Sequence, residues 1–136
     1  MKGNSTRYQL TLTILWWGWG VVLILILVAL SSQSAIFGDQ TAAAWQWFFP
    51  NITPTMGLVG AAAYTKGTSP SVASGAIKPL FILALVASLV YLILLTAALL
   101  GVFFTAHPIS WLTKTNIWLG TVQTLTASTL GAFFAK

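Results

Sequence analysis

Long runs of apolar residues dominate the chain, and short polar segments separate them. The runs cover approximately residues 10–31, 41–64, 79–104 and 110–135. A helix needs about 20 mostly apolar residues to cross a bilayer, so each run is long enough for one span. As a helix, the first run would be about 31 Å long. The pattern therefore predicts an all-α integral membrane protein with four transmembrane helices, forming a single membrane domain over residues 1–136.

Two prolines interrupt the second run, at Pro50 and Pro54. Thr53 is a suitable N-cap and Pro54 suits the first position of a helix, so a short helix could begin there after an interfacial segment. A helix over 54–66 would be only about 20 Å long, too short to cross. We therefore favour one span that is broken near Pro50–Pro54. The freed carbonyls need partners, which makes Asn51 and Thr53 a predicted contact site.

The basic residues predict the orientation of these spans. With four spans, five of the six basic residues share one side of the membrane, whereas a re-entrant second segment would remove this bias. The positive-inside rule then places both termini on the cytoplasmic side of a bacterial inner membrane or its equivalent. The five residues are Lys2, Arg7, Lys66, Lys78 and Lys136, and Lys114 lies on the other side.

Composition narrows the classes of function. Only 5% of the residues are charged and 57% are hydrophobic, far from the roughly 25% charge of soluble domains. Asp39 is the only side-chain carboxylate, His107 is the only imidazole, and there is no cysteine. A metal site needs three or four ligands, so we expect no catalytic residue, no metal and no cofactor in this chain. The basic residues are scattered, which argues against nucleic acid as a partner.

The fourth run is the most informative segment. On a helical wheel one face carries small and polar residues, whereas the opposite face carries Trp118, Leu119, Val122, Leu125, Leu130 and Phe133. The small and polar face also includes Thr113, Ile117, Thr121, Ala127 and Ala135. We call its central members the polar stripe: Asn116, Gly120, Gln123, Thr124, Ser128 and Gly131.

A stripe of this kind has two physical uses in a membrane. The spacing of Gly120, Thr124 and Ser128 is typical of closely packed helices that form hydrogen bonds with one another. Asn116 and Gln123 lie on the same side, and neutral polar groups can also line a narrow water-filled pore. Both uses remain open at this point.

The expected orientation of the fourth helix follows from which of its residues gain free energy by facing lipid and which gain it by facing protein or water. Because lipid is apolar, we expect Gly120, Thr124 and Ser128 to face protein or a lumen. The apolar residues Trp118 and Val122, together with Leu125, should face lipid or a looser contact. The main hypothesis is a non-enzymatic membrane subunit that assembles through this helix with copies of itself or with other membrane subunits. The alternative is a small oligomeric channel or pore whose lumen this helix lines.

Overall fold

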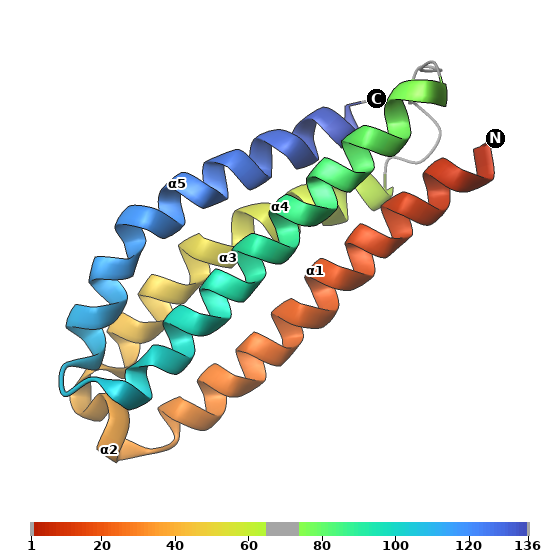
Figure 1. Ribbon diagram of the computed structural model, residues 1–136. Helices are drawn as coiled ribbons and strands as arrows, with labels where there is room; N and C mark the ends of the chain where they lie inside the picture. The colour runs from red at the N-terminus through yellow and green to blue at the C-terminus, as the bar shows by residue number, and fades with distance from the viewer. Residues whose placement is uncertain (1, 65–73, 136) are drawn as a thin grey trace.

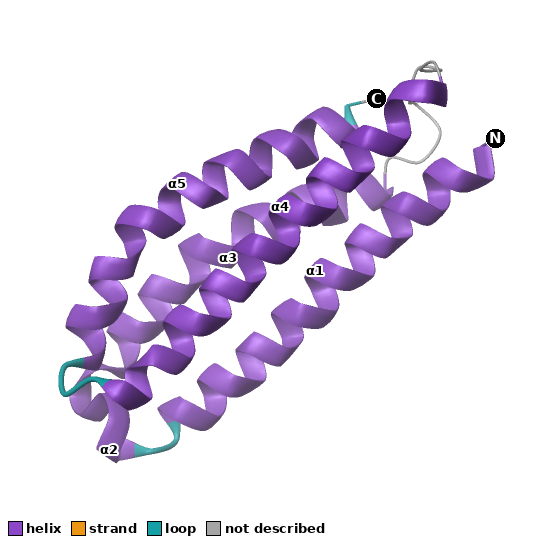
Figure 2. Ribbon diagram, in the orientation of Figure 1, coloured by secondary structure: helices purple, strands orange, loops and turns teal. Residues whose placement is uncertain are grey.

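The computed structural model describes residues 2–64 and 74–135, and these residues form helices joined by short connections. No strand occurs among them (Figure 2). The all-α prediction is therefore confirmed. The long helices are α1 (Lys2–Ser31), α3 (Thr41–Tyr64), α4 (Ser74–Leu100) and α5 (Pro108–Phe134), and the short ones are α2 (Ser34–Phe37), η1 (Gly38–Gln40) and η2 (Gly101–Phe104).

The four long helices form a bundle in which each successive helix reverses direction (Figure 1). Around the bundle the order of packed neighbours is α1, α3, α5, α4 and back to α1. The pair α1/α4 therefore forms one side of the bundle and the pair α3/α5 forms the opposite side. The start of α1 and the end of α5 lie at the same end of the bundle (Figure 1).

Each long helix contributes a large side chain to the core. Trp16, Phe48, Tyr91 and Leu119 come from α1, α3, α4 and α5 in turn, and all four are fully buried. The rings of Trp16 and Tyr91 are stacked with their centroids 5.9 Å apart. The Trp16 Nε1 donates a hydrogen bond to the Ser88 hydroxyl at 3.0 Å, so the buried indole nitrogen is satisfied. These contacts bind α1 to α4 along their middle turns.

The α1/α4 side presents large aliphatic side chains outward. By length and composition α1 and α4 are apolar enough to cross a membrane, over Thr6–Ser31 and Ile77–Phe104, and only 28% of each apolar window is buried. The buried helix of a soluble core would instead be mostly covered. We call this surface the aliphatic side; its exposed members are Leu10, Ile14, Val21, Val22, Leu25, Val28, Ile82, Leu83, Val86, Val90 and Ile93.

The α3/α5 side has a different outer surface. Several of its exposed positions are small, hydroxylated or proline, namely Thr53, Pro54, Gly57, Thr121, Thr124 and Ser128. The large apolar residues Phe49, Ile117, Trp118 and Leu125 are also exposed. At 100° per residue Trp118 and Leu125 fall on the edge of α5 nearer α4, whereas the polar stripe falls on the edge nearer α3 and Ile117 lies among its exposed members. The α1/α4 side therefore exposes mainly large aliphatic side chains, whereas the α3/α5 side also exposes small and hydroxylated residues.

The predicted break in the second span is wrong. Helix α3 runs without interruption from Thr41 to Tyr64 and contains both Pro50 and Pro54. A proline inside a helix removes one backbone hydrogen bond and frees the carbonyl four residues earlier. Helix α5 supplies a replacement donor for the carbonyl that Pro54 frees, as described below, and the chain is helical through both prolines. Similarly, α4 begins at Ser74, so Pro79 lies inside the helix and not at its start.

Candidate functional site

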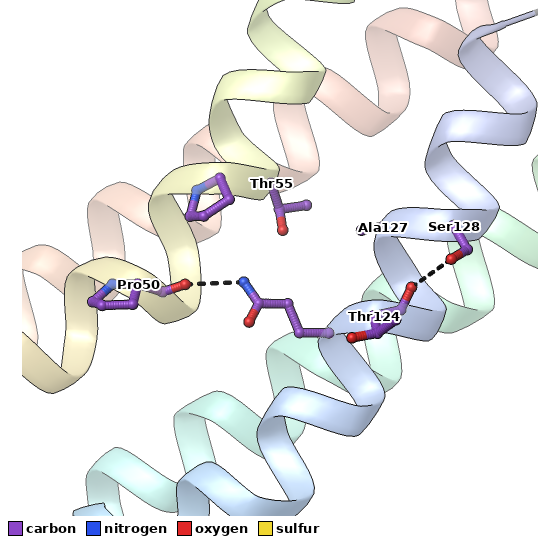
Figure 3. A pocket seen from close by; sticks show the side chains of 7 residues that line it. Pro50, Thr55, Thr124, Ala127 and Ser128 are labelled. Atoms are coloured by element: carbon purple, nitrogen blue, oxygen red, sulfur yellow. Dashed lines mark hydrogen bonds between the residues drawn. The ribbon is translucent and has the colours of Figure 1, made fainter.

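The prolines of α3 expose backbone oxygen atoms to α5. Because Pro54 has no N–H, the carbonyl of Pro50 lacks its usual helical donor. The side-chain Nε2 of Gln123 donates to this carbonyl oxygen at 3.0 Å (Figure 3). A residue of the polar stripe therefore replaces a hydrogen bond that the sequence of α3 cannot make for itself.

Asn51 is the point at which three helices meet. It is buried, and its Nδ2 donates to the Trp47 carbonyl at 2.6 Å and to the Asn116 Oδ1 at 3.2 Å. The hydroxyl of Tyr91, from α4, donates to the carbonyl oxygen of Asn51. The structure thus places Asn51 at a contact between helices, although the helix break from which that contact was predicted is not present. Thr53 is exposed and lies outside this set of hydrogen bonds.

A groove of about 530 Å³ lies between α3 and α5, beside the Gln123–Pro50 hydrogen bond. No lining side chain carries a charge, and the polar ones are hydroxyls and one amide. Figure 3 shows the α3 residues on one wall and Thr124, Ala127 and Ser128 on the other. The lining residues are Pro50, Pro54, Thr55, Gln123, Thr124, Ala127 and Ser128. Two members of the polar stripe besides Gln123 therefore form part of the groove.

The hydroxyl groups around the groove differ in how they are satisfied. The Thr124 Oγ1 donates to the Gly120 carbonyl at 2.9 Å, and the Ser128 Oγ donates to the Thr124 carbonyl at 2.7 Å. Their oxygen lone pairs remain able to accept. Thr55 is only 1% exposed, and its hydroxyl has no hydrogen-bond partner among the described residues. Figure 3 shows this hydroxyl directed into the space between the two helices.

The glycines of the polar stripe face open space. A Cβ added at Gly120 or Gly131 would meet no atom within 4 Å. A Cβ added at Gly20, in the packed face of α1, would lie 2.8 Å from the Sδ of Met56. Close packing inside the chain therefore explains the glycine at position 20, but it explains neither glycine of the stripe.

The orientation of α5 agrees with only part of the expected pattern. Thr124 and Ser128 are exposed at the outer surface and do not face the chain's own core. Leu119, Leu130 and Phe133, from the opposite face of the wheel, are buried instead. Val122 was expected to face lipid or a looser contact, and it packs partly buried against the core. Whether the stripe meets another protein or a lumen stays a prediction.

Pairs of tryptophan and hydroxyl residues join the helices elsewhere, and the sequence did not identify them. The Trp19 Nε1 donates to the Thr96 Oγ1 at 2.8 Å, and the Trp47 Nε1 donates to the Thr115 Oγ1 at 3.2 Å. The sequence does show tryptophan, serine and threonine residues within its apolar runs. It does not show which of them lie at the same level of the bundle, so the pairs could not be assigned.

The only side-chain carboxylate and the only imidazole of the sequence do not line the groove between α3 and α5. Asp39 in η1 and His107 before α5 are both exposed. Within residues 2–64 and 74–135 no three or more His, Asp or Glu side chains lie together. No protein-family model matches the chain, and comparisons with curated proteins and with solved structures give no match either.

Proposed function

We propose that this chain is a non-enzymatic, multi-pass membrane subunit that assembles through its α3/α5 side. The aliphatic side of α1 and α4 faces lipid. The polar stripe of α5 faces another membrane helix, which comes from a second copy of the chain or from a larger membrane complex. Lipid, other membrane subunits and copies of itself are the partners in this proposal, and nucleic acid is not.

The observation that carries the proposal is the difference between the two sides. Lipid tails satisfy the exposed Leu, Ile and Val side chains of α1 and α4, but they offer no hydrogen bond and no special fit to glycine and hydroxyl residues. Gly120 and Gly131 leave space that no side chain of the described residues fills. Small residues of this kind let a second helix approach closely, and hydroxyls form bonds of about 0.6–2 kcal/mol across such contacts.

All four long helices cross the membrane in this proposal, with both termini on the cytoplasmic side of a bacterial inner membrane or its equivalent. The support is the basic bias described above, together with the position of the two chain ends at one end of the bundle (Figure 1). Arg7 in α1 and Lys78 in α4 are both exposed near that end. Lys114, in the second turn of α5, lies toward the opposite end.

The test compares the same substitution on the two sides of the bundle. Gly120→Leu places a large side chain on the polar stripe, whereas Gly18→Leu places the same side chain at an exposed position on α1. Neither glycine has an atom within 4 Å of an added Cβ, so both variants should fold alike. Ser128→Leu is a second variant on the stripe. The assembly of each variant is measured by native mass spectrometry from detergent, with identification of any chain that co-purifies.

We expect Gly120→Leu and Ser128→Leu to reduce assembly and Gly18→Leu to leave it unchanged. A bulky side chain on the stripe holds the two helices apart, whereas at position 18 it meets only lipid. The proposal fails if all three variants assemble like the parent chain. Partners with other sequences indicate a larger complex, and a closed ring of this chain alone indicates self-assembly.

The groove between α3 and α5 favours a second candidate function, a small channel or pore. Its uncharged polar lining is of the kind that can wet a narrow passage once several copies surround it. Single-channel recording in planar bilayers separates the two functions. If the stripe lines a lumen, Ser128→Leu should lower conductance while the assembly persists. If it is a packing seam, the assembly itself should be lost.

A further inference from the structure

We infer that the α1/α4 side binds an anionic phospholipid at the end of the bundle where α1 begins. Arg7 of α1 and Lys78 of α4 hold the phosphate of the headgroup, and the acyl chains lie along the aliphatic side. The inference rests on the proposed function, because it takes these helices to cross a membrane. It deepens that function by naming the class of lipid that the aliphatic side selects.

Arg7 and Lys78 lie at the same level of two neighbouring helices. The rings of Tyr8 and Phe81 stack with their centroids 4.2 Å apart, which brings these two positions of α1 and α4 side by side. Arg7 directly precedes Tyr8, and Lys78 lies three residues before Phe81, or about 4.5 Å along the helix axis. Both cations are therefore within one helical turn of the stacked rings, and both side chains are exposed.

Helical period places the two cations at adjoining parts of the α1/α4 surface. Thr96 lies about five full turns after Lys78 and shares its edge of α4. Thr96 accepts a hydrogen bond from Trp19, so this edge faces α1. Leu25 lies about five turns after Arg7 and is 62% exposed on the aliphatic side. Arg7 therefore continues the aliphatic side, and Lys78 lies beside it where the two helices meet.

Both cations lie where an apolar span begins. The segments that are long and apolar enough to cross a membrane are Thr6–Ser31 in α1 and Ile77–Phe104 in α4, so Arg7 and Lys78 are each the second residue of a span. The boundary between the hydrocarbon core and the headgroup region is the depth at which lipid phosphates lie. The proposed topology places this end at the cytoplasmic leaflet, which carries anionic lipids.

The charge of the two side chains selects an anionic ligand. Asp39 is the only side-chain carboxylate of the sequence, and it lies in η1, which follows α2 at the opposite end of α1 (Figure 1). It therefore does not neutralise Arg7 or Lys78. A guanidinium presents paired donors that fit a phosphate, and an ammonium adds a second positive charge. An anionic phospholipid balances these charges, whereas a zwitterionic headgroup brings a cation of its own.

The ligand is a lipid and not a free phosphate, because the cations adjoin exposed aliphatic residues. Leu10 follows Arg7 by three residues and is 53% exposed, and Ile82 follows Lys78 by four residues and is 49% exposed. Residues three or four positions apart are neighbours on a helix surface. A phosphate held by the two cations therefore places its acyl chains against aliphatic side chains of the same two helices.

The test measures which lipid the full chain retains. The chain is mixed in detergent with equal amounts of phosphatidylglycerol and phosphatidylcholine that have the same acyl chains, and native mass spectrometry counts the bound lipids. Arg7→Gln and Lys78→Gln each remove one cation from the proposed site. Lys114→Gln is the matched control, because it removes an exposed cation of α5 toward the opposite end of the bundle.

We expect the parent chain to retain phosphatidylglycerol about tenfold or more in preference to phosphatidylcholine. Arg7→Gln and Lys78→Gln should each lower this preference about fivefold, which is the effect of one cation near a membrane surface. Lys114→Gln should leave the preference unchanged. An equal preference in all four chains overturns the inference. Displacement of the bound lipid by excess glycerol 3-phosphate would also overturn it, because the cations would then bind a soluble phosphate.

A relocated charge separates a site from general attraction to anionic lipid. Arg7→Gln combined with Ala132→Lys restores the net charge at the same end of the bundle, but at an exposed position of α5 (Figure 1). This double variant should show as weak a preference as Arg7→Gln alone. If the second substitution restores the preference, any charge at this end is sufficient, and the site on α1 and α4 is overturned.

Flotation with phosphatidylcholine vesicles after alkaline extraction distinguishes failure of this inference from failure of the proposed function. A chain that does not float is not embedded in lipid, so the membrane-subunit proposal fails and the lipid site fails with it. A chain that floats but retains both lipids equally leaves the membrane-subunit proposal standing and removes only the anionic lipid site.

Discussion

The side-chain amide of Gln123 lies 3.0 Å from the backbone carbonyl oxygen of Pro50 and donates a hydrogen bond to it. Pro54, four residues after Pro50, cannot supply the helical N–H that this oxygen would otherwise accept. A residue that is 69 positions away from Pro54 in the sequence therefore replaces the backbone hydrogen bond that α3 loses at Pro54. This contact supports the helix where Pro54 interrupts its hydrogen bonding, and it lies at one edge of the groove.

This relationship predicts the outcome of a double-mutant cycle. Gln123→Leu should lower the free energy of unfolding by about 0.5–2 kcal/mol, because the Pro50 carbonyl loses its donor. Pro54→Ala restores a backbone N–H to that carbonyl. In the Pro54→Ala background the cost of Gln123→Leu should therefore become smaller. Unfolding by a denaturing detergent in mixed micelles measures all four chains of the cycle.

Gln46→Leu is the matched control for the cycle, since Gln46 is an exposed glutamine of α3. It should change the stability little in either background. Equal costs of Gln123→Leu with and without Pro54 would contradict the role assigned to this hydrogen bond.

The Tyr91 hydroxyl should contribute measurably to the contact between α3 and α4. Tyr91→Phe removes its hydrogen bond to the Asn51 carbonyl but keeps the ring that stacks on Trp16. We expect a loss of about 1 kcal/mol in the free energy of unfolding. Tyr8→Phe is the control, because it keeps the stacking of that ring on Phe81 and removes only a hydroxyl at a partly buried position. A loss at position 8 as large as at position 91 would speak against the prediction.

Two glycines should respond in opposite ways to alanine. A Cβ at Gly101 would lie 2.6–2.7 Å from atoms of the Trp111 indole, whose Nε1 donates to the Ala98 carbonyl at 2.8 Å. Gly101→Ala should displace this ring and cost about 1–3 kcal/mol. Gly131 lies within helix α5, and a Cβ added there points into open space. Because alanine has a higher helix propensity than glycine, Gly131→Ala should raise the free energy of unfolding of the isolated chain by up to about 1 kcal/mol. Thermal unfolding in detergent compares the two variants, and equal shifts would contradict the packing described here.

The four-span topology predicts that both ends of the chain are reached from one face of the membrane. Gly3→Cys and Ala135→Cys should be labelled by an impermeant thiol reagent from the same side, because an even number of spans returns the chain to its starting side. Ala106→Cys should be labelled from the other side. Labelling of positions 3 and 135 from opposite faces would show an odd number of spans, and the basic bias would then have another cause.

The sequence alone determined which segments are helical. Runs of more than 20 apolar residues with almost no charge leave few alternatives to helices, and the structure contains helices in all four runs. The wheel of the fourth run also separated the face of Leu119 and Leu130 from the face of Thr124 and Ser128, but the sequence did not give which of the two faces is buried in the bundle. These properties depend on composition and period, which are local to each segment.

Only the tertiary structure decided whether the prolines would break α3, and which polar groups would meet. Proline lowers the stability of a helix by an amount that local rules express, but the donor that offsets it comes from α5. The predicted break was wrong, and at Pro54 this donor replaces the hydrogen bond that the helix loses. Likewise, Asn51 could be singled out by its place between two prolines, whereas its partners Asn116 and Tyr91 depend on the register of three helices. Helical period sets the face that a residue occupies, but packing sets the residue it meets.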